Sequence, residues 1–180
     1  MSEHVRHAQT FVFALEDVPP GRGLDLGSGG GVPGLILALA RPAWHWVLLD
    51  SSARRTSFLD RAVRSLGLGD RVRVATGRAE DVGRRPDHRH GYQLVVARSF
   101  ARPAVVAECA APFLMVGGTL AVSEPPDGGD RWPEDGLGTF GLRLLPVPNT
   151  DHHLAMLRQD VLCPDRFPRR VGIPAKRPLW

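Results

Sequence analysis

The sequence has no apolar run that approaches the roughly 20 residues needed to cross a bilayer. Its first residues, with Glu3, His4 and His7, also lack the basic segment followed by an apolar one that is typical of a signal peptide. These two absences argue against the membrane-spanning and secreted classes. We therefore expect a cytoplasmic protein with no membrane partner.

Cysteine and lysine are both scarce. The two cysteines, Cys109 and Cys163, and the seven histidines show no metal-ligand spacing, so we expect no metal site. Only one of the 23 Lys and Arg residues is a lysine, Lys176, and the net charge is +4. Arginine pairs with phosphate and stacks on bases through its planar guanidinium. The charge is thus compatible with a nucleic-acid partner and equally with an ordinary solvated surface.

The chain has 180 residues, of which 43% are hydrophobic, and this fits a single globular domain. Short apolar runs predict strands at 24–26, 46–49, 71–75, 93–97, 119–123, 140–145 and 154–158. Helical patterns occupy 3–15, 35–40 and 103–115. A further helix is predicted to begin at a cap formed by Ser51 or Ser52 and to end at Gly67. The stretches 83–91 and 125–138 favour loops. This alternation predicts an α/β fold with a mostly parallel seven-stranded sheet and one antiparallel strand, formed by residues 21–180 behind a packing helix in residues 1–20.

The segment from Leu24 to Gly34 reads Leu-Asp-Leu-Gly-Ser-Gly-Gly-Gly-Val-Pro-Gly and predicts a strand, a glycine turn and a helix. Gly27, Gly29 and Gly31 can take positive φ and allow a ligand to approach the backbone closely, next to the amides that begin a helix. This indicates a nucleotide-type cofactor. Because Gly29, Gly31 and Gly34 also satisfy G-x-G-x-x-G, a dinucleotide and S-adenosylmethionine both remain open at this point.

Acidic residues at the ends of the neighbouring strands favour S-adenosylmethionine. Asp50 ends the second strand, where a carboxylate can accept both ribose hydroxyls of either cofactor. Asp25, just before the glycines, would repel a pyrophosphate but attract a cationic methionine end. The segment Ala79-Glu80-Asp81 follows the third strand, where an adenine amine could bind, and the closing strand pair suits a methyltransferase sheet. We therefore predict a class I S-adenosylmethionine-dependent methyltransferase fold of the Rossmann-like type.

Purely structural roles remain open for several of these residues. Asp25 could only cap its turn, and Glu80 and Asp81 could cap a helix. Arg98, at the end of the fourth strand, could pair with a carboxylate.

Several motifs together resemble one family, the bacterial small-subunit ribosomal RNA guanine-N7 methyltransferases, also called glucose-inhibited division protein B. The motifs are Asp25-Leu-Gly-Ser-Gly-Gly-Gly-Val-Pro-Gly34, Leu48-Leu-Asp-Ser51 with Arg54-Arg55 and Phe58-Leu59, Arg78-Ala-Glu80, Arg98 with Phe100-Ala101, His153-Leu154, and the tail Phe167-Pro-Arg-Arg-Val-Gly-Ile-Pro-Ala-Lys-Arg-Pro-Leu179. The resemblance implies cofactor contacts at Gly27, Val32, Ala79, Glu80 and Arg98, with Asp50 on the ribose. The full set of predicted cofactor-binding residues is Asp25, Gly27, Gly29, Val32, Asp50, Ser51, Ala79, Glu80 and Arg98.

The resemblance also implies an acceptor, ribosomal RNA or the small ribosomal subunit, and a reaction. Guanine N7 carries a free lone pair, so direct displacement at the sulfonium methyl needs positioning and no general base. Hence no catalytic base is predicted, S-adenosylhomocysteine would be the product, and Arg98 is the candidate for orienting the donor carboxylate or the substrate. For RNA phosphates, the predicted residues are Arg169, Arg170, Lys176 and Arg177, which could also form a solvated end.

The sequence departs from the family pattern after the fifth strand, where Ser123-Glu124-Pro125 replaces a lysine and a glycine. It also lacks the longer amino-terminal segment of most members. Two alternatives therefore stay open, a methyltransferase for a small molecule or other acceptor and a non-catalytic protein that binds S-adenosylmethionine. We expect a monomer.

Overall fold

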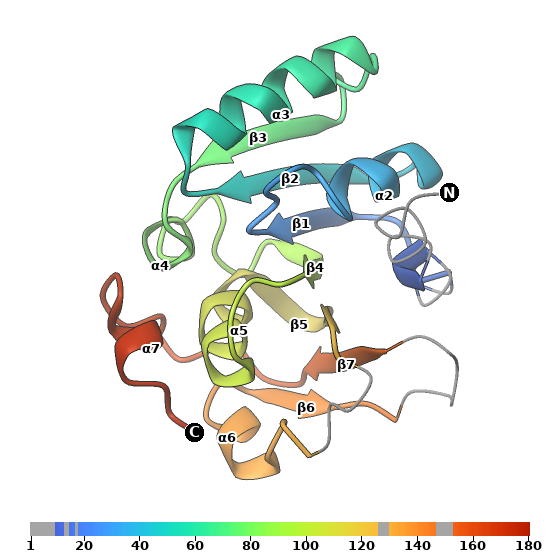
Figure 1. Ribbon diagram of the computed structural model, residues 1–180. Helices are drawn as coiled ribbons and strands as arrows, with labels where there is room; N and C mark the ends of the chain where they lie inside the picture. The colour runs from blue at the N-terminus through green and yellow to red at the C-terminus, as the bar shows by residue number, and fades with distance from the viewer. Residues whose placement is uncertain (1–9, 13–14, 17, 126–129, 147–152) are drawn as a thin grey trace.

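The computed structural model describes residues 10–12, 15–16, 18–125, 130–146 and 153–180. These residues build one seven-stranded sheet (Figure 1), whose strands follow the order β3-β2-β1-β4-β5-β7-β6. The strands are β1 (Arg22–Leu26), β2 (His45–Asp50), β3 (Val72–Thr76), β4 (Tyr92–Ala97), β5 (Leu114–Ser123), β6 (Leu142–Leu144) and β7 (Leu154–Gln159). Only β7 runs against the others, pairing antiparallel with both β5 and β6. This confirms the predicted α/β class with one antiparallel strand.

Helices cover both faces of the sheet. On one face, α2 (Gly34–Ala40) and α3 (Ala53–Ser65) pack on the strands through a buried cluster that includes Leu37, Leu59 and Val63. Trp44 and Trp46 belong to the same cluster, so both are packing residues. The other face carries α5 (Pro103–Ala110) and the shorter helices, namely α4 (Ala79–Val82), η1 (Ala111–Phe113), α6 (Glu134–Gly138) and α7 (Ile173–Lys176).

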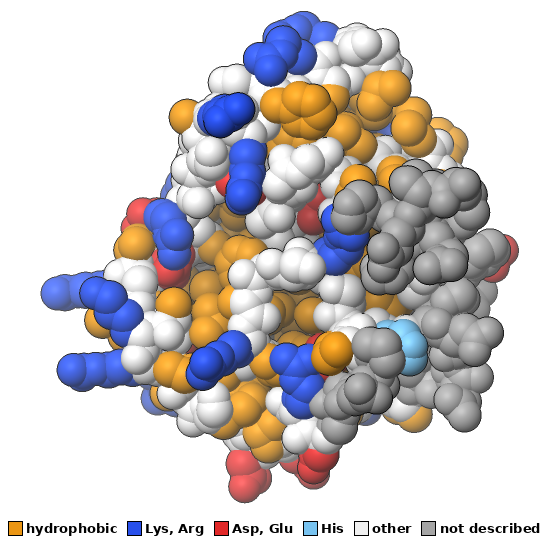
Figure 2. All heavy atoms as spheres, in the orientation of Figure 1, with side chains coloured by type: hydrophobic (Ala, Val, Ile, Leu, Met, Phe, Trp, Pro, Cys, Tyr) orange, Lys and Arg blue, Asp and Glu red, His pale blue; other side chains and the backbone are white. Residues whose placement is uncertain are grey.

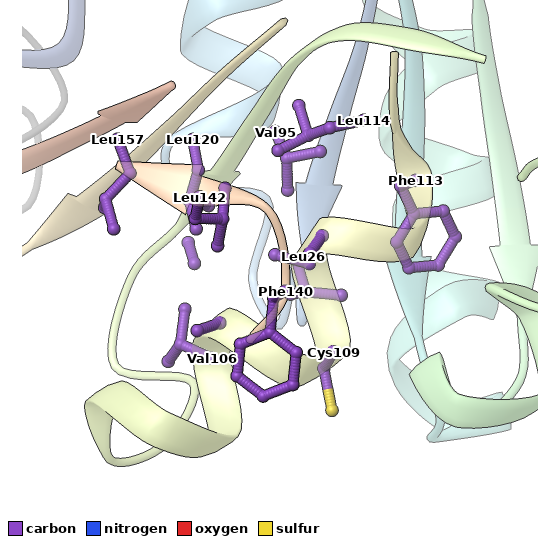
Figure 3. Close-up of a cluster of buried hydrophobic side chains, with 14 of the residues drawn as sticks. Leu26, Val95, Val106, Cys109, Phe113, Leu114, Leu120, Phe140, Leu142 and Leu157 are labelled. Carbon is purple, nitrogen blue, oxygen red and sulfur yellow. The ribbon is translucent and has the colours of Figure 1, made fainter. Parts of the chain in front are cut away.

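The larger core cluster lies between the sheet and α5 (Figure 3). Leu26, Val95 and Leu120 point to it from three adjacent strands, and Val106 and Phe140 close it from the helical side. Along β4 the side chains alternate between clusters, since Val95 and Ala97 face this core whereas Leu94 and Val96 face the core under α2 and α3. A sheet buried on both faces explains why the strands read as continuous apolar runs.

Within the described residues, the structure corrects two predicted boundaries and adds four short helical segments, α4, η1, α6 and α7. The helix predicted to reach Met115 ends at Ala110, because Pro112 has no N–H and its ring clashes with the preceding turn; a 3₁₀ turn follows and β5 begins at Leu114. The short helix α6 lies inside the stretch 125–138 that was predicted to be a loop, and α7 forms in the carboxyl-terminal tail.

The predicted amino-terminal helix, residues 3–15, lies mostly outside the described residues. Within it, residues 10–12 are helical, and Phe11 and Leu15 are buried against the α2 and α3 side of the sheet. In the described part of the chain, no helix is long and apolar enough to span a membrane.

Replacing Leu120 in the centre of β5 tests the core. The side chain is fully buried, so Leu120→Ala should lower the free energy of unfolding by about 2–5 kcal/mol through lost burial and the cavity left behind. The control Leu39→Ala removes a side chain that is 51% exposed and should change the free energy by about 0.5 kcal/mol or less. Urea denaturation of both variants measures the difference, and equal losses would contradict the assigned core.

Candidate active site

The glycine turn after β1 lies at the carboxyl ends of the parallel strands. The backbone N–H groups of Gly27 and Ser28 both donate to the Leu49 carbonyl oxygen at 2.9 Å, which ties the turn to the end of β2. Gly27 has φ +76°, and a Cβ there would lie 2.6 Å from the Phe100 ring. Glycine at this position therefore satisfies both the left-handed backbone and the close approach of Phe100.

Asp25 is a buried anchor beneath this turn. It is 1% exposed, and its Oδ2 accepts the Gly34 N–H at 3.0 Å at the start of α2. Burial raises the pKa of Asp25 to about 7, although the hydrogen bonds from Gly34 and Ser28 and the charge of Arg98 oppose that shift. These contacts match the structural alternative for Asp25, because its carboxyl group holds the turn and the helix together.

Asp50 joins the glycine turn to the segment that follows β2. Its Oδ2 accepts the Gly29 N–H at 2.9 Å and its Oδ1 accepts the Ser52 N–H at 2.8 Å. The side chain of Arg55 approaches Oδ2 at 3.6 Å. A carboxylate has about four acceptor sites, so each oxygen keeps capacity for a further donor such as a hydroxyl group.

A cavity of about 260 Å³, here called the small cavity, opens beside this turn. Five predicted residues line it, Gly27, Asp50, Ser51, Ala79 and Glu80. The other residues of its wall include Leu26, Leu49, Arg78, Val105, Cys109 and Ala175.

Four predicted cofactor-binding residues are not among those that line the small cavity. Asp25 and Gly29 lie behind its wall, where they shape the turn through the hydrogen bonds above. Val32 is half-buried and precedes the cis peptide bond to Pro33. Arg98 lines the neighbouring cavity instead and lies close enough to Asp25 to stabilise its charge.

The carboxyl-terminal segment completes one wall of the small cavity. Glu80 is 3% exposed, and its Oε1 accepts the Gly172 N–H at 3.0 Å and an Arg78 N–H at 3.2 Å. Burial alone would raise the pKa of Glu80, but these hydrogen bonds and the charge of Arg78 outweigh it and hold the pKa below its usual value. Ala175 of α7 thereby reaches the cavity wall.

A second cavity of about 530 Å³, here called the large cavity, lies next to the small one. Both cavities share the segment Ser99-Phe100-Ala101 after β4 as a wall. Ser99 has φ +51°, a left-handed conformation that is uncommon outside glycine. This segment therefore separates two compartments at the carboxyl ends of β1, β4 and β5.

The large cavity contains charged groups that the sequence did not single out as site residues. Glu124 accepts a hydrogen bond from the Arg131 side chain at 2.9 Å, and Trp132 is buried beside them. The position of Glu124 directly after β5 is a sequence signal for the rim of an α/β sheet. The contacts of Arg131 and Trp132 with Glu124 could not be predicted from the sequence.

The four basic residues of the tail that were predicted to bind RNA phosphates lie in two different environments. Arg169 makes three side-chain contacts of 2.6–3.1 Å with Glu108, which is fully buried on α5, and a fourth with the Arg177 carbonyl oxygen. Arg170, Lys176 and Arg177 have exposed side chains. Arg169 therefore has a structural partner that accounts for it without RNA, and Glu108 is a residue that the sequence analysis missed.

No group of His, Cys, Asp or Glu within the described ranges could hold a metal ion. Cys109 lies in the apolar core, where burial raises the pKa of its thiol, and it borders the small cavity. Cys163 is also buried and free.

The sheet order, with β7 antiparallel between β5 and β6, and the cavities at the strand ends place the chain in the class I methyltransferase fold. It shares this fold with a geranyl diphosphate methyltransferase solved in complex with S-adenosylmethionine (25% sequence identity, TM-score 0.56, 67% of this chain and 48% of the other). The model of the family rRNA small subunit methyltransferase G matches residues 2–123. The chain belongs to this family, as its motifs predicted.

Relatives of the same name match nearly the whole chain. The ribosomal RNA small subunit methyltransferase G of Moorella thermoacetica is 34% identical over 98% of this chain and 77% of its own length. That of Symbiobacterium thermophilum is 37% identical over 93% of this chain and 74% of its own length.

Arg169→Ala should destabilise the fold, because it leaves the buried Glu108 carboxylate without its partner. We expect a loss of about 3–5 kcal/mol in the free energy of unfolding. The neighbouring variant Arg170→Ala removes the same charge from an exposed side chain and should cost about 0.5 kcal/mol or less. Thermal and urea unfolding of the pair measure this, and similar stabilities would refute the structural role of Arg169.

Proposed function

We propose that this protein transfers the methyl group of S-adenosylmethionine to N7 of a guanine in small-subunit ribosomal RNA. The observation that carries the proposal is the pair of cavities that meet at Ser99-Phe100-Ala101. A methyltransferase must place a donor and an acceptor in line on either side of one boundary, and this arrangement supplies two compartments with a common wall. The names of the relatives at 34–37% identity favour ribosomal RNA as the acceptor.

The residues of the small cavity fit the adenosine and methionine parts of S-adenosylmethionine. Asp50 can accept hydroxyl groups of the ribose on its remaining lone pairs. The backbone around Gly27 can approach the ligand because no Cβ intervenes there. Ala79 and Glu80 would lie beside the adenine, with Leu26, Leu49 and Val105 supplying apolar surface. When bound, the cofactor supplies an electrophilic methyl group.

The chain contributes positioning and the exclusion of water. Guanine N7 has a lone pair outside the ring π system, so the attacking atom needs no deprotonation. The half-buried Phe100 and the tied glycine turn hold the two compartments at a fixed separation, which lowers the entropic cost of in-line attack. Arg98, on the large cavity, would orient the base or a nearby phosphate.

Exposed basic residues surround the two cavities and suit an RNA backbone. Figure 2 shows Lys and Arg side chains projecting along α3 and at the edge where Figure 1 places α7. Those on α3 are Arg54, Arg55, Arg61 and Arg64, and those of the tail are Arg170, Lys176 and Arg177. We further propose that the enzyme acts in the cytoplasm, as a monomer, on the small ribosomal subunit or its RNA.

Methyl transfer is tested with labelled S-adenosylmethionine and small ribosomal subunits that lack the modification. Label in the RNA, released as 7-methylguanine after hydrolysis, is the expected result. Label at another atom would overturn the N7 assignment. Absence of label, with donor binding intact, would favour a different acceptor, the alternative suggested by the departure from the family pattern at Glu124.

Asp50→Ala should abolish or weaken donor binding by at least about 100-fold. The variant removes the ribose acceptor and also the two backbone hydrogen bonds that shape the glycine turn, each worth about 1.5–3 kcal/mol when the acceptor is charged. Asp60→Ala removes an exposed carboxylate from the outer face of α3 and serves as the matched control. Calorimetric titration with S-adenosylmethionine gives both affinities, and unchanged binding by the Asp50 variant would exclude this donor site.

The paired variant Arg170→Ala/Arg177→Ala should weaken RNA binding and reduce its salt dependence. Each lost phosphate contact lowers the slope of log K against log salt by about 0.7–0.9, so we expect a decrease of about 1.5. Arg143→Ala/Arg158→Ala removes two charges from the strand pair β6 and β7 and controls for net charge. Filter binding to unmodified small-subunit RNA over a salt series measures both, and equal slopes would place the RNA elsewhere.

A further inference from the structure

The large cavity has one carboxylate in its lining, together with Arg98, Arg131 and several apolar side chains. Glu124, directly after β5, has a side chain that is only 13% exposed, and its backbone N–H donates to the His153 carbonyl oxygen at 2.7 Å. Phe100, Val106, Val122 and Trp132 also line the cavity. The cavity is large enough for a small ligand, so this carboxylate, which is paired with Arg131, would also face that ligand.

Glu124 is paired with Arg131 through one of its two carboxylate oxygens. Burial raises the pKa of Glu124, and the charge of Arg131 and the indole N–H of Trp132 oppose that rise. Arg131 donates to Oε2 at 2.9 Å, and a carboxylate has about four acceptor sites in total. The indole N–H of Trp132 is also buried without a partner of normal geometry among the described residues. The Glu124 carboxylate therefore keeps acceptor capacity for a ligand inside the cavity.

We propose that Glu124 selects guanine by accepting hydrogen bonds from N1–H and the N2 amino group of the acceptor base. This inference rests on the proposed function and names the residue that sets its base specificity. Guanine alone among the four RNA bases presents these two adjacent donors on its Watson–Crick edge. Adenine would place the lone pair of its N1 against the carboxylate, which repels it.

The strand order would direct N7 of a base bound to Glu124 toward the small cavity. β1, β4 and β5 are neighbours, and their ends carry Gly27, the shared wall and Glu124 in that order. Neighbouring strands lie about 4.8 Å apart, so about 10 Å separates the end of β1 from the end of β5. N7 lies on the side of guanine opposite to N1 and N2. A base held by Glu124 therefore directs N7 toward the wall and the small cavity behind it.

Aromatic side chains in the same cavity suit an unstacked base. Phe100 forms part of the shared wall, and Trp132 lies beside Glu124. Proteins that act on a single base hold it out of its stack between aromatic or apolar groups and bind its Watson–Crick edge. Figure 2 shows a hollow with hydrophobic side chains in the middle of the face that carries the basic residues of α3 and the tail.

The inference is tested by equilibrium dialysis of labelled GMP, IMP and AMP against the whole protein saturated with S-adenosylhomocysteine. IMP lacks only the N2 amino group and keeps N7. The wild type should bind GMP at least about tenfold more tightly than IMP, because one hydrogen bond to a charged group contributes at least that factor to the affinity. It should bind AMP more weakly than IMP. Glu124→Gln keeps the shape of the side chain but replaces one acceptor with a donor, so it should bind GMP and IMP equally.

The matched control is Glu134→Gln, which removes an exposed carboxylate on α6, outside the residues that line the large cavity, and should preserve the preference for GMP. Unchanged binding of S-adenosylhomocysteine by both variants shows that they are folded. Equal binding of GMP and IMP by the wild type, or an unchanged preference in Glu124→Gln, would overturn the inference. The proposed function fails separately, if small subunits take up no methyl group while the preference for GMP persists.

Discussion

The interaction on which the site depends is the pair of hydrogen bonds from the Gly29 and Ser52 N–H groups to the Asp50 carboxylate. It joins the turn after β1 to the segment after β2 and fixes the backbone that lines the small cavity. Because both partners are main-chain groups, the geometry depends on Asp50 and on the glycine conformations, with no further side chain between them. The same carboxylate borders the cavity, so one residue both shapes the turn and presents acceptor oxygens to the cavity.

Burial gives the acidic residues at the rim different roles. Asp25 lies below the turn with a raised pKa and acts as an anchor for α2. Glu80 is also buried, but hydrogen bonds from Gly172 and Arg78 stabilise its charged form and bring the carboxyl-terminal segment to the cavity. Glu124 lines the large cavity and pairs with Arg131. Similar side chains thus anchor a helix, hold the carboxyl-terminal segment or line a cavity according to their neighbours.

The carboxyl-terminal segment links the fold to the surface on which RNA would lie. The buried pair of Glu108 and Arg169 fastens this segment to α5, and the exposed Arg170, Lys176 and Arg177 extend from the same short stretch. In the proposed function, a rigid base for these cations would reduce the entropy lost when they meet phosphate groups. It also keeps the basic edge at a constant distance from the cavities.

The order of strands and helices and the glycine turn could be predicted from the sequence. Apolar runs and capping or breaking residues are local signals, and parallel strands alternating with helices leave few arrangements of the sheet. The class of cofactor could also be predicted from the sequence, because Asp25, Asp50 and Glu80 occur at strand ends that must meet at one rim. The helix break at Pro112 was present in the sequence, but the apolar residues around it suit a helix and a strand equally.

The roles of individual charges were decided by the tertiary structure alone. Arg169 and Arg170 are adjacent and identical in type, yet one pairs with a buried carboxylate 61 positions away and the other is exposed. Arg98 could be placed on the rim from the sequence, but its position on the large cavity depends on the turn at Ser99. The sequence by itself determined which residues reach the rim, because strands that alternate with helices run parallel and their carboxyl ends meet at one edge. Which of them are open to a ligand depends on burial and on partners distant in the chain.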